Sequence, residues 1–136
     1  MATTTAKRTK LTGTFDVSSW EEDAYREAGG EPKLTHVLGS QAFSGDIAGD
    51  GTIAWLMCYR PDGSARFVGL QHISGTFGDR QGSIVIESVG DHDGKTSRGT
   101  WTVVDGSGTG DLDGVAGRGS FSAPGGRTVE YELELE

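Results

Sequence analysis

Cysteine and long apolar runs are scarce in this chain. The single cysteine, Cys58, excludes an intramolecular disulfide bond, which is typical of proteins that work in a reducing compartment. Residues 1–8 lack the apolar core of a signal peptide, and no apolar run approaches the length needed to cross a bilayer. These absences predict a soluble, cytoplasmic protein with no membrane partner.

Positive charge is scarce as well. The chain carries 12 Lys and Arg residues against 20 Asp and Glu residues, which gives a net charge of −8 and a pI near 4.8. Such a balance repels a nucleic-acid backbone on average, and the one basic cluster, Lys7-Arg8-Lys10, has the pattern of a solvated tail. We therefore expect no nucleic-acid partner.

The motifs of metal and nucleotide sites are also missing. His36, His72 and His92 are scattered, and the acidic turn around His92 fits neither a zinc site nor a calcium loop. The glycine-rich run 106–110 has no lysine after it and opens no helical pattern, so it does not fit a phosphate-binding loop. We expect no metal and no cofactor.

Glycine, by contrast, is abundant. The 23 glycines are spread from Gly13 to Gly126 among Val, Ile, Phe and Trp, and glycines inside strands are typical of bulges and sharp bends. Alternation with a period of two recurs along the chain and is cleanest over residues 128–136. About eight antiparallel strands with little helix indicate an all-β barrel or sandwich. The dispersed glycines favour a single closed barrel over residues 10–136, after a flexible tail over residues 1–9.

One hairpin is defined by its turn residues. The run Arg60-Pro61-Asp62-Gly63-Ser64 has turn residues that pair Arg60 with Ser64 and place Trp55 opposite Gly69. Upstream, we expect a strand over residues 10–17, a capped turn around residues 18–23 and a loop over residues 25–32.

The predicted registers sort the middle strands into two faces. We assign one face to the interior because, over residues 98–102, the opposite face has a solvated pattern. The other face then exposes a contiguous apolar patch, which usually marks a subunit contact and predicts a homo-oligomer. This patch comprises Trp55, Met57, Tyr59, Phe67, Ile84 and Ile86. A register slip of one residue would reverse the faces and place the patch in the lumen.

Candidate catalytic residues lie on the assigned interior face. His72 and Glu87 are predicted to lie opposite each other, as a general acid–base pair or as a structural ion pair. Cys58, on the same face as Arg66, is either a nucleophile or a small buried hydrophobe. The predicted substrate-binding residues are Leu56, Arg66, Leu70 and Trp101, together with Tyr59 and Trp55, which line the cavity if the faces are reversed.

Four sequence blocks carry a resemblance to a known family. They are residues 13–20 (GTFDVSSW), 59–64 (YRPDGS), 67–70 (FVGL) and 100–104 (TWTVV). Residues 11–135 thereby resemble a bacterial family catalogued only as a domain of unknown function, three-two-two-four in its series. The run 108–119 (GTGDLDGVAGRG) is similar to a turn of allene oxide cyclase and dirigent proteins. That second resemblance implies an eight-stranded antiparallel barrel, often oligomeric, whose apolar lumen steers reactive intermediates by shape.

These inferences predict a small-molecule-binding barrel. The leading hypothesis is a cyclase or isomerase of secondary metabolism that folds an apolar or partly polar substrate in its lumen with few catalytic groups. The alternative is a non-catalytic carrier or sensor of an apolar ligand, in the manner of lipocalins. A purely structural oligomer with a filled barrel is a third possibility. Only the enzyme should show titrating groups in a pH–rate profile.

Overall fold

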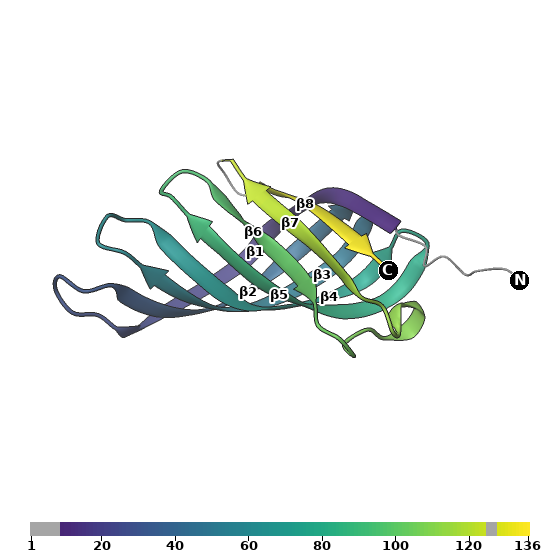
Figure 1. Cartoon of the computed structure of the whole chain (residues 1–136), viewed down its shortest axis with the longest axis horizontal. Coiled ribbons are helices and arrows are strands. Elements are labelled where there is room, and N and C mark those ends of the chain that lie inside the picture. The colour runs from purple at the N-terminus through teal and green to yellow at the C-terminus, as the bar shows by residue number, and fades with distance from the viewer. Residues whose placement is uncertain (1–8, 125–127) are drawn as a thin grey trace, which may run out of the picture.

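The computed structural model describes residues 9–124 and 128–136. It is a closed barrel of eight antiparallel strands with one short 3-10 turn (Figure 1). In chain order these are β1 (Thr9–Arg26), β2 (Lys33–Gly45), β3 (Ile47–Tyr59), β4 (Ala65–Phe77), β5 (Arg80–His92), β6 (Ser97–Val103), η1 (Gly110–Leu112), β7 (Gly117–Ala123) and β8 (Thr128–Leu135). The predicted all-β barrel is confirmed. Of the predicted tail, Thr9 begins β1, and residues 1–8 lie outside the described residues.

The two ends of the barrel differ. Each strand pairs with its neighbours along the chain, and β1 closes the barrel against β8. At one end the hairpin tips step back from the β1–β2 hairpin to the β5–β6 hairpin (Figure 1), because strands must tilt and stagger when a sheet closes. We call this staggered end the open end, and the end that carries η1 the closed end.

The long loop between β6 and β7 covers the closed end. Leu112 and Val115 of this loop are buried. Several hydrogen bonds tie the loop to β5. Among them, the backbone N–H of Ser83 donates to Thr109 Oγ1 at 3.0 Å, and the backbone N–H of Gln81 donates to Asp111 Oδ2 at 2.9 Å. The barrel is therefore plugged at this end by its own side chains.

Strand β1 is longer than predicted. It runs to Arg26 instead of ending near Val17, so the capped turn expected around residues 18–23 is wrong. The loop expected over residues 25–32 begins two residues later, after Arg26, and ends before Lys33 as predicted. The reason for the longer strand is that β8 pairs with β1 only over Thr9–Asp16. Beyond Asp16, β1 pairs with β2 alone and stands at the rim, where exposed polar side chains need not alternate with apolar ones.

The predicted face assignment of β3, β4 and β5 is also wrong. Trp101 and Val103 of β6 face inward as expected, but their inward partners on β5 are Ser88 and Ile86. The prediction had placed Glu87 on that face instead. The β5–β6 connection holds four residues, 93–96, so β5 pairs with β6 in a register that differs by one residue from the predicted one. Because the predicted faces of β3, β4 and β5 were linked through this register, all three are reversed. The apolar patch that predicted a homo-oligomer therefore lines the interior.

Aromatic side chains fill the middle of the barrel. Trp101 is the hub, with ring centroids 6.1 Å from Phe15, 5.8 Å from Phe121 and 5.9 Å from Tyr131. Trp101 and Tyr131 are almost fully buried. This layer separates the packed closed end from a cavity at the open end, since Phe15 and Phe121 also border that cavity.

Candidate functional site

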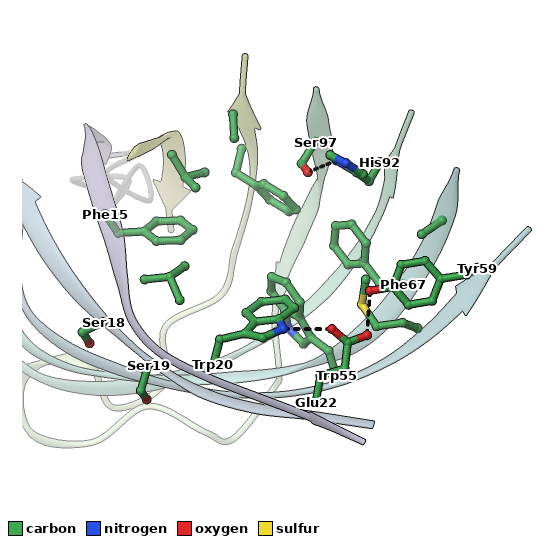
Figure 2. A pocket seen from close by; sticks show the side chains of 16 residues that line it. Phe15, Ser18, Ser19, Trp20, Glu22, Trp55, Tyr59, Phe67, His92 and Ser97 are labelled. Atoms are coloured by element: carbon green, nitrogen blue, oxygen red, sulfur yellow. Dashed lines mark hydrogen bonds between the residues drawn. The ribbon is translucent and has the colours of Figure 1, made fainter. Parts of the chain in front are cut away.

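A cavity of about 580 Å³ opens at the staggered end of the barrel. Its size is within the range of small-molecule pockets. Its wall is mostly apolar and aromatic, as Figure 2 shows. The described residues that line it are Phe15, Val17, Ser18, Ser19, Trp20, Glu22, Trp55, Met57, Tyr59, Ala65, Phe67, His92, Ser97, Phe121, Ala123 and Val129.

Stacked aromatic rings form one wall of this cavity. Trp55 stacks on Phe67 with ring centroids 4.8 Å apart and an interplanar angle of 17°. Trp20 meets Trp55 edge-on, with centroids 6.0 Å apart at 82°. Gly69, opposite Trp55 on β4, leaves room for the indole, as the turn of the β3–β4 hairpin predicted. The stacked pair of this wall, Trp55 and Phe67, is therefore held by β3 and β4, whose register is set by the hairpin turn that joins them.

A bulge in β1 brings Glu22 into the cavity. Below the bulge the inward residues of β1 are odd-numbered, as in Phe15 opposite Phe43. The register shifts by one residue between Val17 and Ser19, so even-numbered residues line the cavity beyond it. Trp20 and Glu22 therefore share the inward face at the rim.

Three side-chain donors hold the Glu22 carboxylate. The hydroxyls of Thr35 and Tyr59 each donate to Oε2 at 2.6 Å, and the indole N–H of Trp20 donates to Oε1 at 2.9 Å. Figure 2 shows the Trp20 and Tyr59 bonds converging on this carboxylate. Lys33 Nζ lies 5.1 Å from the centroid of the Tyr59 ring.

This network sets the charge of the part of the cavity around Glu22 and its three donors, which we call the Glu22 corner. Burial raises the pKa of the Glu22 carboxyl, but the hydrogen bonds from Thr35, Tyr59 and Trp20 and the charge of Lys33 lower it by more, so the net shift is downward. Burial raises the pKa of the Tyr59 phenol, and its bond to Glu22 and the charge of that carboxylate raise it further. At neutral pH the corner therefore holds a fixed carboxylate and a protonated phenol, and Glu22 is a weak proton acceptor.

A second polar group lies on β5 and β6. His92 Nδ1 and Ser97 Oγ are 2.7 Å apart and both line the cavity. Figure 2 shows this pair at a distance from the Glu22 corner. Among the described residues, no three His, Cys, Asp or Glu side chains are placed to share a metal ion.

The predicted catalytic residues lie outside the barrel. His72 and Glu87 are exposed, and they are not opposite each other, because His72 pairs with Val85 and Glu87 pairs with Leu70. Cys58 is half-buried on the outer side of β3, next to Arg66. Their predicted place in the lumen is therefore wrong, for the register reason given above, and they bring no chemistry to the cavity.

The predicted binding residues divide into three groups. Leu56 and Leu70 are exposed on the outer face, and Arg66 forms an ion pair there with Asp91 at 2.7 Å. Trp101 faces inward but is packed below the cavity. Trp55 and Tyr59, which were assigned to the other face, are the two that line the cavity.

Sequence reasoning missed Glu22, Trp20 and His92. The available signal was an aromatic residue two positions from an acid, Trp20 and Glu22, which on any strand share a face. Because residues 18–23 were predicted to form a capped turn, Trp20 and Glu22 were not placed on one face of a strand. His92 was treated as part of a hairpin tip, whereas it is the last residue of β5.

The fold and the site define a class: a closed, eight-stranded antiparallel barrel that is plugged at one end and has an aromatic-lined cavity at the other. Residues 11–135 match the family described as "Protein of unknown function (DUF3224)", and the chain belongs to this family. The resemblance seen in the sequence blocks is thus confirmed for the family.

One solved structure of the same family is similar over nearly the whole chain. It is the 1.84 Å crystal structure of a protein with unknown function from the DUF3224 family of Shewanella oneidensis MR-1. The two share 27% sequence identity with a TM-score of 0.80, over 96% of this chain and 98% of the other. No curated protein matches this chain. These comparisons lend no support to the resemblance to allene oxide cyclase and dirigent proteins. Within the described residues, no helix is both long and apolar enough to cross a membrane.

Proposed function

We propose that this protein binds an apolar small molecule in the cavity at the open end of the barrel. The supporting observation is the cavity itself, about 580 Å³ in volume, with stacked aromatic walls and a single fixed carboxylate. Pockets of this kind gain affinity from apolar area and orientation from a few polar groups. The carrier or sensor role needs nothing more than this arrangement.

Catalysis by a cyclase or isomerase is the second candidate. The acid–base pair first predicted for it, His72 and Glu87, is outside the barrel. One observation still favours it: the Glu22 carboxylate lies against the same aromatic wall as Trp20 and Tyr59. Such a surface stabilises positive charge that develops on a hydrocarbon. A proton transfer through Glu22 is disfavoured, because its pKa is lowered.

Titration with a neutral apolar fluorophore, N-phenyl-1-naphthylamine, tests the binding role. We expect saturable binding to the wild type and at least about tenfold weaker binding to Val17→Trp, whose ring would fill the cavity. The matched control is Val104→Trp, at an exposed valine that does not line the cavity. It should bind the probe as the wild type does. Equal binding by Val17→Trp and the wild type, or no binding by the wild type, would contradict the proposal.

A further inference from the structure

The charge inside the cavity has one sign. Of the described residues that line it, Glu22 is the only acid, and none is a lysine or an arginine. The hydrogen bonds from Thr35, Tyr59 and Trp20 keep the carboxylate in place without neutralising its charge. Among the described residues, Glu22 forms no ion pair, since Lys33 interacts with it only at longer range. The corner therefore retains attraction for a cation.

Aromatic side chains border this charge. Trp20 contacts both Glu22 and Trp55, and Tyr59 contacts Glu22 from β3. Tryptophan and tyrosine rings attract cations through their negative faces, and cages of such rings are how proteins recognise alkylated ammonium groups. Lys33 Nζ, 5.1 Å from the centroid of the Tyr59 ring, shows that this corner already holds one ammonium group in that way.

The rest of the cavity suits an uncharged body. Apart from the hydrogen-bonded residues, it is lined by Phe15, Phe67 and Phe121, together with Met57 and Val129. A ligand with one charged end and an apolar remainder would therefore match the distribution of polar and apolar walls. The net charge of −8 also raises the local concentration of cations around the protein.

We propose that the ligand is an apolar organic cation, an alkylated or protonated amine, with its charge beside Glu22 and its apolar body on the phenylalanine wall. This inference rests on the proposed binding function. It adds the ligand's chemical class, which that function leaves open, and assigns Glu22, Trp20 and Tyr59 as the residues that select it.

Two probes of the same shape separate charge from burial. In benzyltrimethylammonium a positive nitrogen stands where neopentylbenzene has a carbon. Each is measured by its displacement of N-phenyl-1-naphthylamine. We expect the wild type to bind the cation at least about tenfold more tightly than the neutral probe. Glu22→Gln should remove most of that preference and leave the neutral affinity within about twofold, which also shows that the cavity is intact.

Two further variants sharpen the test. Glu21→Gln removes the same charge from the neighbouring residue, which does not line the cavity, and should keep the preference. Lys33→Met removes the competing ammonium and should increase it. Equal affinities for both probes in the wild type, or an unchanged preference in Glu22→Gln, would overturn the inference while leaving the proposed function standing. Failure of both probes and the fluorophore to bind would overturn the proposed function itself.

Discussion

At the scale of single residues, the hydrogen bond from Tyr59 to Glu22 has a consequence for stability. Tyr59→Phe removes one of the three donors to the carboxylate and should lower the free energy of unfolding by about 1 kcal/mol at neutral pH. The pKa of Glu22 in the folded protein lies below its ordinary value of 4.5. Its contribution is therefore present above that value and is lost as the pH falls through the folded pKa.

The difference between the wild type and Tyr59→Phe in urea unfolding should accordingly shrink as the pH falls below 4.5 and through the lowered pKa of Glu22 in the folded protein. Tyr25→Phe is the matched control, because Tyr25 is also a tyrosine near the open end but is 59% exposed. It should unfold like the wild type at every pH. A loss in Tyr59→Phe that stayed constant with pH would show that the Glu22 bond is not its cause.

A second prediction at this scale concerns Gly69. A Cβ added there would collide with the backbone oxygen of Ala54 and with the Trp55 ring. Gly69→Ala should therefore destabilise the protein by about 1–3 kcal/mol and weaken binding of the neutral fluorophore, because Trp55 must move. Gly29→Ala is the control, since nothing lies within 4 Å of its added Cβ. Full stability of Gly69→Ala in thermal unfolding would contradict this account of the wall.

At the scale of elements, two turns explain which parts of the fold could be predicted. In the β3–β4 hairpin, Gly63 has a φ of 90° and the Arg60 N–H donates to the Ser64 oxygen at 2.7 Å. Its residues specify that geometry, and the predicted register is confirmed. At the β5–β6 connection, Asp93 Oδ1 accepts the backbone N–H groups of both Lys95 and Thr96. These two hydrogen bonds close a four-residue loop, residues 93–96, and the acidic turn residues around His92 do not specify that length.

The wrong register at this one loop reversed the predicted inward and outward faces of β3, β4 and β5. Alternation separated the two faces of a strand, and in β8, where Tyr131, Leu133 and Leu135 are buried, it also identified the inward face. It did not fix which face of β3 to β5 was inward, because both faces carry apolar residues such as Leu56 and Met57. The candidate site was therefore assigned to the wrong side of the sheet. The bulge of β1, which aims Glu22 inward, leaves no comparable mark in composition.

The bulge itself can be tested. Ser18 is skipped in the backbone register with β2, although its hydroxyl lies 2.9 Å from Ser40 Oγ. Ser19 pairs with Ser40 and Trp20 with Gly39. Deletion of Ser18 should leave a regular ladder in which Trp20 and Glu22 still face the cavity, so the preference for the cationic probe should change by less than about twofold. Deletion of Thr14, which is paired on both sides, should instead shift β1 against β8 and unfold the barrel. Loss of the preference on deleting Ser18 would contradict this account and would show that the local geometry of the bulge, beyond the one-residue shift, is needed to position Glu22.

At the scale of the whole molecule, the outer surface carries its own apolar patch. It consists of Leu38, Leu56, Val68 and Leu70, all between 42% and 50% exposed on β2, β3 and β4. Leu56 pairs with Val68, and Leu70 pairs with Ala54, which in turn pairs with Leu38, so the patch is continuous across the three strands. The patch from which the sequence predicted a homo-oligomer lies inside the barrel, so that prediction now depends on this outer patch instead.

This outer patch makes the prediction of a homo-oligomer testable. Two copies, each with a charge of −8, repel one another, and a patch without charged side chains is where the repulsion opposes contact least. We expect the wild type to sediment as a dimer, and Leu56→Lys combined with Leu70→Lys to sediment as a monomer that still binds the neutral fluorophore. Val104→Lys, at an exposed valine beyond the end of β6, should remain dimeric. A monomeric wild type would contradict the prediction of a homo-oligomer. It would not bear on the proposed binding function, because the cavity lies on the inner side of these strands.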